Sequence, residues 1–244
     1  MNISFEEGLA ILEALARNSR HSTISQIRSQ THFDESTIQE TLKILEATRY
    51  ISLSCTPSRI SLSPKLWSLG FCQEDPTALK RVADRYLSEL AMETRESARA
   101  GVIADQEIVL VAGINMPESA VPELAVGTKL PVRDCALGKA ILAFQSAQLI
   151  GEAKEIIPAT DSAQREPEAL RRELELVRSR GYAVHFDETR GMECEIAAPV
   201  RCAGESVEAA ICLSGPSSRL TPDAIPALAE HVLAAADRIS RQLS

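Results

Sequence analysis

The sequence has few aromatic residues and no long hydrophobic run, although 45% of its 244 residues are hydrophobic. Its longest apolar segments, such as EIVLVAGI and ALGKAILAF, are far shorter than the roughly 20 residues needed to cross a bilayer. The N-terminal stretch MNISFEEGLAILEAL lacks the basic flank and the small-residue cleavage site of a secretory signal. We therefore expect neither a membrane protein nor a secreted one, and predict a cytoplasmic location.

Two kinds of chemical signature are also missing. The six cysteines form no Cys-x-x-Cys pair and match no zinc-module spacing, so we predict reduced, mostly buried thiols, no metal and no cofactor. The sequence holds no nucleophile elbow, no His-Glu-x-x-His, no phosphate-binding loop and no dinucleotide fingerprint. The histidines are scattered, at His21, His32, His185 and His231. An enzyme is not expected, although a dyad formed by distant residues stays open.

Acidic charge is concentrated in one part of the chain. Residues 1–72 hold seven Lys/Arg and seven Asp/Glu, whereas residues 73–244 hold 19 and 27 and so carry the whole net charge of −8. An acidic body argues against broad, non-specific binding of nucleic acid. A neutral N-terminal part can still bind DNA if its basic groups lie on one face.

The pattern of the N-terminal part predicts three short helices followed by a hairpin. Apolar residues recur at helical spacing from Phe5, NSRHST ends that helix, and Ser22 or Thr23 caps a second one. Asp34 caps a third helix. The expected apolar faces of the three helices are Phe5, Leu9, Leu12 and Ala16; Ile24 and Ile27; and Ile38, Leu42 and Leu45. ISLSC and SRISL alternate like strands around the turn TPS, so residues 1–66 predict a winged helix-turn-helix.

The rest of the chain predicts an α+β domain. Residues 67–95 are expected to form connecting helices, and residues 96–244 a separate domain. Strands are expected at ARAGVIAD, EIVLVAGI, TKLPVRD, YAVHFD, CEIAAPVRC and VEAAICLSG. Helices are expected at CALGKAILAFQS, at residues 167–180 before Gly181, and from Pro222 onward. Strands with helices around them predict an antiparallel sheet flanked by helices.

Four segments of the chain resemble the IclR family of transcriptional regulators. RSRGYAVHFDETRGMECEIAAPV with EAAICLSGPSSRLTPD, and KLPVRDCALGKAILAF, are similar to its C-terminal domain, while GLAILEAL to ATRYI is similar to its winged helix-turn-helix. The resemblance covers nearly the whole chain in the right order. It implies an operator-binding domain, a GAF-like domain that binds a small organic or aromatic acid, and a homodimer or homotetramer.

The third helix is the expected DNA-reading element. Glu35, Ser36, Gln39, Glu40 and Lys43 are expected to face outward, and at three of these positions the family commonly carries Lys, His and Arg. Hydroxyls at a helix N-terminus suit phosphate, Gln can pair with adenine, and a carboxylate can accept from cytosine. The candidate DNA-binding residues are Arg28, Ser36, Thr37, Gln39, Glu40, Lys43, Arg49 and Arg59.

The expected effector site begins at the helix after Asp134, whose free N–H groups suit a carboxylate. The resemblance implies a lining of Cys135, Ala136, Leu137, Asp187, Met192, Cys194, Cys212 and Ser214. The three cysteines are either apolar wall residues or a redox or soft-metal sensor. Asp187 is either a ligand acceptor or a loop acid. Arg133 and Arg190 pair with a ligand or lie on the surface, and His185 is structural.

Two classes of function remain from the sequence. The first is a ligand-responsive transcriptional regulator. The second is a metabolite-binding or protein-interaction protein whose helix-turn-helix no longer binds DNA, because winged helices also serve as protein-interaction modules. Operator binding separates the two.

Overall fold

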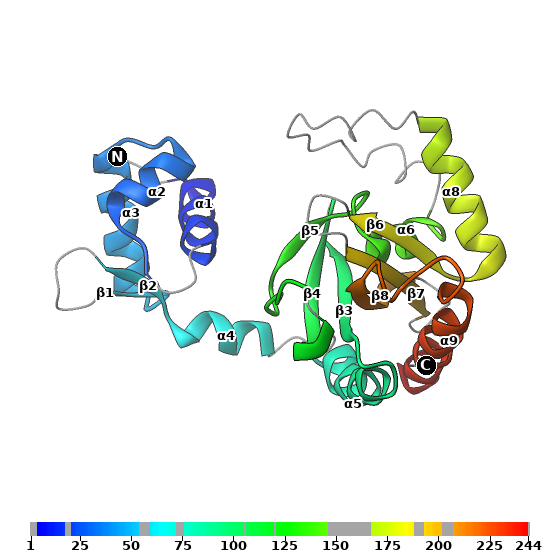
Figure 1. The fold of residues 1–244 in the computed structure, drawn as a ribbon. Helices are drawn as coiled ribbons and strands as arrows, with labels where there is room; N and C mark the ends of the chain where they lie inside the picture. Colours follow the sequence, from blue (N-terminus) through cyan, green and yellow to red (C-terminus); the bar gives the residue numbers. More distant parts are fainter. Residues whose placement is uncertain are drawn as a thin grey trace. The chain divides into compact units, whose positions relative to one another are not determined.

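The computed structural model describes residues 4–17, 21–53, 59–71, 76–104, 106–119, 121–145, 167–187, 193–201 and 207–243. The chain divides into two compact units, Met1–Glu74 and Asp75–Ser244, here the N-terminal and C-terminal units. In Figure 1 they run from blue to cyan and from green to red. None of the described helices is long and apolar enough to pass through a membrane.

The N-terminal unit contains the three helices and the hairpin that the sequence predicts. The hairpin strands pair antiparallel, with Ser52 opposite Ser61, and the predicted turn TPS lies outside the described residues. The elements are α1 (Phe5–Ala16), α2 (Ile24–Thr31), α3 (Glu35–Ala47), β1 (Ile51–Leu53), β2 (Ile60–Leu62) and α4 (Pro64–Phe71). This is a winged helix-turn-helix arrangement.

Side-chain caps fix where the first three helices begin. Ser4 and Thr23 each form a capping box, and the carboxylate of Asp34 accepts the backbone N–H of Thr37 at 2.8 Å. Of the two candidates for the second cap, Thr23 is therefore the one used. Ser22 instead exchanges backbone hydrogen bonds with Ile60, which ties the start of α2 to the hairpin.

The apolar face of α3 is buried as predicted, but that of α1 is rotated from the expected stripe. Ile38, Leu42 and Leu45 lie in the core of the unit. In α1, Phe5 is 81% exposed, while Ile11 and Leu15 are buried. The segment GLAILEAL offers two overlapping apolar stripes, and packing of α1 on α2 and α3 selects the one that the periodicity alone did not favour.

The C-terminal unit is built on one six-stranded antiparallel sheet with the order β5-β4-β3-β8-β7-β6. The predicted strands are therefore confirmed. They are β3 (Ser97–Ala104), β4 (Glu107–Ile114), β5 (Lys129–Pro131), β6 (Ala183–Asp187), β7 (Glu193–Arg201) and β8 (Val207–Pro216), with a short 3-10 helix η1 (Pro117–Ser119) after β4. The central strands β3, β8 and β7 are almost entirely buried.

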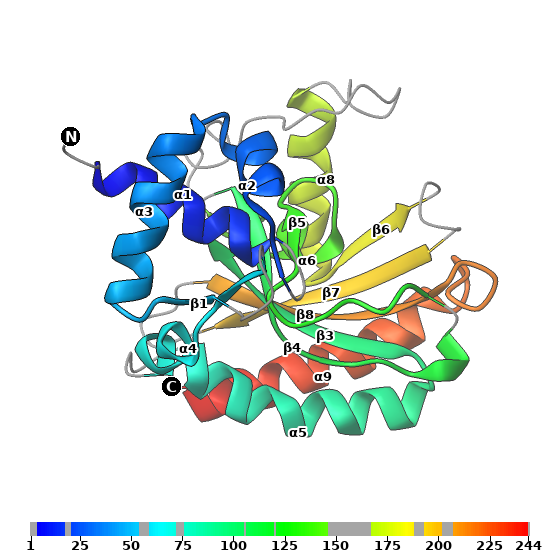
Figure 2. The same ribbon diagram turned by 90° about the vertical axis from the view of Figure 1, so that its left-hand side faces the viewer.

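Helices cover both faces of this sheet, as predicted. On one face α5 (Pro76–Thr94) and α9 (Ile225–Leu243) lie side by side, and on the other lie α6 (Ala136–Leu142) and α8 (Pro167–Arg180) (Figures 1 and 2). α9 begins at Ile225 rather than at the expected Pro222, and in the turn before it the backbone N–H groups of Ala224 and Ile225 donate to the Thr221 carbonyl.

Strand alternation decides which residues can meet α6. Ile211 and Leu213 of β8 and Cys194 and Ile196 of β7 pack in the core beneath α5 and α9. The residues between them face the other way, because successive side chains of a strand point to opposite faces. Cys212 of β8 accordingly packs with α6.

Candidate functional site

The exposed side of α3 carries polar groups of both charges. Glu35, Ser36, Gln39 and Lys43 are exposed, and Glu40 is half-buried. The side-chain amide of Gln39 donates to the Glu35 carboxylate at 3.2 Å, one turn away. A base that uses the Gln39 amide must therefore compete with Glu35.

The N-terminus of α3 is occupied by the cap of the helix itself. Ser36 Oγ donates to Asp34 Oδ1 at 2.6 Å and Thr37 Oγ1 to Asp34 Oδ2 at 3.2 Å. The hydrogen bond from Ser36, followed by that from the Thr37 backbone, lowers the pKa of Asp34, so this carboxylate is ionised at neutral pH. Thr37 is also buried. The hydroxyl groups of Ser36 and Thr37, which were expected to bind a DNA phosphate, already donate to the Asp34 carboxylate. A phosphate at this end of α3 would also be repelled by that carboxylate.

The remaining expected DNA contacts are basic and lie at the surface. Arg28 on α2, Arg49 just after α3 and Arg59 just before β2 are all exposed. Arg49 has a φ of 64°, the left-handed conformation that ends the helix. With Lys43, these arginines give the unit four exposed cations close to α3 and the hairpin in sequence.

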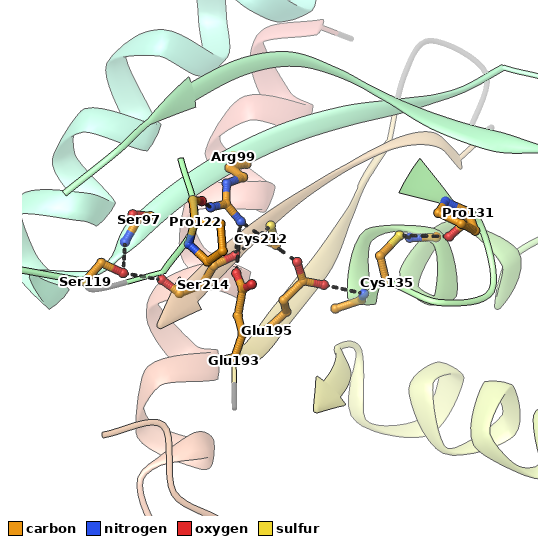
Figure 3. A network of polar contacts seen from close by, with 12 residues as sticks. Ser97, Arg99, Ser119, Pro122, Pro131, Cys135, Glu193, Glu195, Cys212 and Ser214 are labelled. Carbon is orange, nitrogen blue, oxygen red and sulfur yellow. Dashed lines mark hydrogen bonds and ion pairs between the residues drawn. The ribbon is translucent and has the colours of Figure 1, made fainter. Parts of the chain in front are cut away.

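The C-terminal unit holds a buried polar network on the α6 face of its sheet, which we call the Arg99 network: Arg99, Glu193, Glu195 and Ser214 (Figure 3). Arg99 is 1% exposed. Its Nη1 donates to Ser214 Oγ at 2.8 Å and to Glu193 Oε1 at 3.2 Å, and lies 4.0 Å from Glu195 Oε1. Its Nη2 donates to the carbonyl of Pro122 at 2.9 Å. Neighbouring strands β3, β8 and β7 bring these residues together.

Glu195 connects the Arg99 network to the first turn of α6. The backbone N–H of Ala136 donates to Glu195 Oε2 at 2.8 Å, and Figure 3 shows Glu195 between Arg99 and this turn. The sequence predicts that a ligand carboxylate would accept N–H groups at this helix start. In the structure the backbone N–H group of Ala136 instead donates to a carboxylate of the protein itself, that of Glu195.

Two of the three expected pocket cysteines lie close to this network, and the third does not. Cys135 caps α6, where its Sγ accepts the N–H of Gly138 at 3.4 Å. Cys212 Sγ lies 3.8 Å from Ser214 Oγ. Cys194 belongs to the core under α5 and α9, on the opposite face of the sheet, because it alternates with Glu193 and Glu195 along β7.

Burial makes these thiols poor nucleophiles. Desolvation, followed by the nearby Glu195 carboxylate, raises the pKa of Cys212 to about 12 and that of Cys194 to about 12, and raises that of Cys135 further. Among the described residues, no three His, Cys, Asp or Glu side chains are placed to hold a metal ion. These observations favour wall residues over a thiol sensor.

We predict that iodoacetamide at pH 8 leaves Cys135, Cys194 and Cys212 largely unmodified in the folded protein and labels them within minutes in urea. A raised thiol pKa keeps the unreactive protonated form dominant. Peptide mass spectrometry reads each site separately. Rapid native labelling of Cys135 or Cys212 would instead support a reactive sensor.

The other expected effector residues are distributed around α6. Leu137 is fully buried, and Asp187 is half-buried on β6 opposite Glu193. His185 has a structural contact, because its Nδ1 lies 3.2 Å from Lys139 Nζ, which also binds Glu173 Oε1 at 2.7 Å. Met192 and Arg190 lie outside the described residues.

Sequence reasoning missed three members of the Arg99 network: Arg99, Glu193 and Glu195. Each is a charged residue inside a segment that otherwise reads as a buried strand, in SARAGVIA and ECEIAAPV. A charge that strand alternation turns toward a core must be paired, because an isolated buried ion is very costly. That signal marks the residues as unusual, but the pairing itself joins positions about a hundred residues apart.

A family model and several curated relatives match this chain. The family described as bacterial transcriptional regulator IclR, C-terminal, matches residues 75–241. The glycerol operon regulatory protein of Streptomyces griseus is 30% identical, over 98% of this chain and 96% of the relative. The Pca regulon regulatory protein of Pseudomonas putida is 27% identical, over 96% of this chain and 81% of the relative.

Solved structures share the fold over the whole length. An IclR homologue from Microbacterium hydrocarbonoxydans, complexed with 4-hydroxybenzoate, matches with a TM-score of 0.83 at 22% identity, covering 97% of each chain. The IclR of Thermotoga maritima matches with a TM-score of 0.69 at 24% identity, covering 98% of this chain and 97% of that one.

Proposed function

The chain belongs to the IclR family of bacterial transcriptional regulators, and on this premise we propose that it binds operator DNA through its N-terminal unit and responds to a small organic effector bound in its C-terminal unit. The observation that carries the proposal is that relatives named as regulators match this chain across both units. The bound 4-hydroxybenzoate of one structural neighbour supports a small organic acid as the first effector class to test.

The proposed partners follow from this role. Double-stranded operator DNA and an effector are the binding partners, the assembly is a homodimer or homotetramer, and the location is cytoplasmic, where the DNA is. Exposed Phe5 and Leu9 on α1 support self-association of the N-terminal unit, because an apolar patch gains free energy when it is covered. Regulation, not catalysis, is the proposed activity.

Operator binding is tested by fluorescence anisotropy on duplexes taken from upstream of the protein's own gene, over a salt series. We expect Arg28→Ala to weaken binding to all duplexes and to reduce the salt slope by about one for each subunit on the DNA, because each subunit loses one phosphate contact. Arg81→Ala removes the same charge from an exposed position of α5 and should change neither quantity. No operator-specific binding at low salt would favour the alternative, a metabolite-binding or protein-interaction protein.

Glu35→Lys should tighten operator binding at low salt. The substitution removes a carboxylate that opposes phosphate and also frees the Gln39 amide from its 3.2 Å hydrogen bond to Glu35. If the new lysine of each subunit neutralises one phosphate, the salt slope steepens by about 0.9 for each subunit on the DNA. Glu230→Lys makes the same charge change on exposed α9 and serves as the control. Unchanged affinity in Glu35→Lys would mean that this side of α3 does not face DNA.

A further inference from the structure

The side-chain donors in the first two turns of α3 are used by the helix and its cap. Ser36 Oγ and Thr37 Oγ1 both donate to the Asp34 carboxylate, and the Gln39 amide donates to Glu35 Oε1 at 3.2 Å. A carboxylate accepts hydrogen bonds and donates none, so the group of Gln39 that faces Glu35 is its NH2. Gln39 Oε1, on the same planar amide, therefore faces away from Glu35.

The outward side of these two turns consequently offers acceptors. They are the carboxylates of Glu35 and Glu40 and the Oε1 atom of Gln39, which we call the acceptor face. Glu35 and Gln39 are exposed, and Glu40 is half-buried. Lys43 follows one turn after Gln39, is exposed, and can only donate. Along α3 a group of acceptors is thus followed by one cationic donor.

Bases differ in what they offer to such a face. In the major groove cytosine presents an amino N–H, adenine presents an amino N–H beside the acceptor N7, and guanine and thymine present acceptor oxygens. A carboxylate can accept from the cytosine amino group. Adenine N7 repels its second oxygen, and the oxygens of guanine and thymine repel it throughout. Cytosine is therefore the base that a carboxylate of the acceptor face favours most.

The same carboxylates oppose binding to DNA of any sequence, because phosphates repel them. That penalty is offset only where a base donates to the acceptor face, so discrimination comes largely from repulsion of the wrong bases. The charge of the chain acts in the same direction. Residues 1–72 hold as many acidic as basic residues, and the rest of the chain is acidic, which keeps binding to random DNA weak.

We propose that Glu40 determines operator specificity by accepting a hydrogen bond from the amino group of a cytosine. Glu35 is engaged by the Gln39 amide and acts as the positioning residue that turns Gln39 Oε1 toward a neighbouring amino base, cytosine or adenine. Lys43 donates to a nearby guanine, whose N7 and O6 accept. The inference rests on the proposed function, because it assumes that α3 enters the major groove of the operator.

Selection of duplexes from a random library by the full chain, followed by anisotropy on single-base variants, tests the base that is read. We expect each half-site to contain a cytosine whose replacement by thymine weakens binding about tenfold. N4-methylcytosine should weaken binding about as much, because it still pairs with guanine but its methyl group replaces the amino hydrogen in the major groove. 5-Methylcytosine adds a methyl group to the same groove and keeps that hydrogen, so it should be tolerated better.

The possible results of this selection separate the two proposals. Half-sites that require no cytosine, or that tolerate N4-methylcytosine at every cytosine, overturn the inference and leave operator binding in place. If no duplex is enriched, the proposed function fails and the inference fails with it.

Glu40→Gln supplies a readout that a merely structural role would not produce. Glutamine both donates to adenine N7 and accepts from its amino group, so we expect the preferred base at this position to change from cytosine to adenine. Loss of a structural contact would instead weaken all duplexes by one factor. Glu13→Gln makes the same charge change at an exposed position of α1 and should keep the cytosine preference. An unchanged cytosine preference in Glu40→Gln would overturn the role of Glu40.

The positioning role of Glu35 predicts a smaller effect at the neighbouring base. Glu35→Ala removes the partner of the Gln39 amide and should lower the preference for an amino base there about twofold, while the cytosine read by Glu40 stays preferred. Glu35→Gln should restore the preference, because its carbonyl oxygen still accepts from Gln39. Identical preferences in Glu35→Ala and the unmodified chain would remove Glu35 from the reading of bases.

Discussion

Replacing Gly138 with alanine should lower the free energy of unfolding of the C-terminal unit by about 3 kcal/mol or more. A Cβ at Gly138 would lie 1.8 Å from the carbonyl oxygen of Val132 and 2.6 Å from its carbonyl carbon. These are backbone atoms, so no side-chain rotation relieves the overlap. α6 would have to move, and with it the Cys135 cap and the Ala136 contact to Glu195.

Helix propensity alone would lead us to expect the opposite effect on the free energy of unfolding. Alanine in a helix is favoured over glycine by about 1 kcal/mol, so a glycine with room around it should be stabilised by the same change. Gly8 in α1 is such a position, because a Cβ there would meet nothing within 4 Å. Gly8→Ala is therefore the matched control, with an expected gain of about 0.5–1 kcal/mol.

Urea unfolding of the full chain distinguishes the two variants. Circular dichroism follows both units, and hydrogen exchange read on peptides from residues 21–53 and from residues 121–145 follows each unit separately. Gly138→Ala should move unfolding of the C-terminal unit to lower urea concentration and leave that of the N-terminal unit in place. A Gly138→Ala protein that unfolds like the unmodified chain would show that α6 is not packed against Val132 in this way.

The elements of the fold were largely predictable, because each depends on local signals. The α3 stripe of Ile38, Leu42 and Leu45, the Asp34 cap and the alternating strands follow from spacing and capping chemistry. The face of α1 did not follow, because Phe5 and Ile11 are both compatible with the periodicity and only contact with α2 and α3 separates them.

The candidate effector site was less predictable, because its geometry depends on which strands are neighbours. The sequence places Cys212 and Ser214 on one face of a strand, and the structure keeps them together. It could not place Cys194 on the opposite face, since that depends on the phase of β7 relative to β8. It also could not pair Arg99 with Glu193, because the two residues are 94 positions apart.

Replacing Arg99 with methionine should destabilise the C-terminal unit by about 3–5 kcal/mol, although methionine is similar in length. Breaking a buried ion pair by removing one partner leaves an uncompensated charge, and here Glu193 and Glu195 both lose their nearby guanidinium. Ser214 Oγ and the Pro122 carbonyl lose donors as well. Urea unfolding followed by circular dichroism measures the loss, again with hydrogen exchange of residues 21–53 reporting the N-terminal unit.

Two further variants show whether charge, rather than packing, causes that loss. Combining Arg99→Met with Glu193→Gln and Glu195→Gln removes the two carboxylates that lie beside Arg99, and we expect the triple variant to recover most of the lost stability, because a neutral replacement of a buried charge network is often tolerated. Arg85→Met breaks an exposed pair with Glu89 one helical turn away and should leave the free energy of unfolding nearly unchanged, because water screens exposed ion pairs. If the triple variant is as unstable as Arg99→Met alone, the loss comes from packing and from the hydrogen bonds to Ser214 and Pro122 rather than from charge.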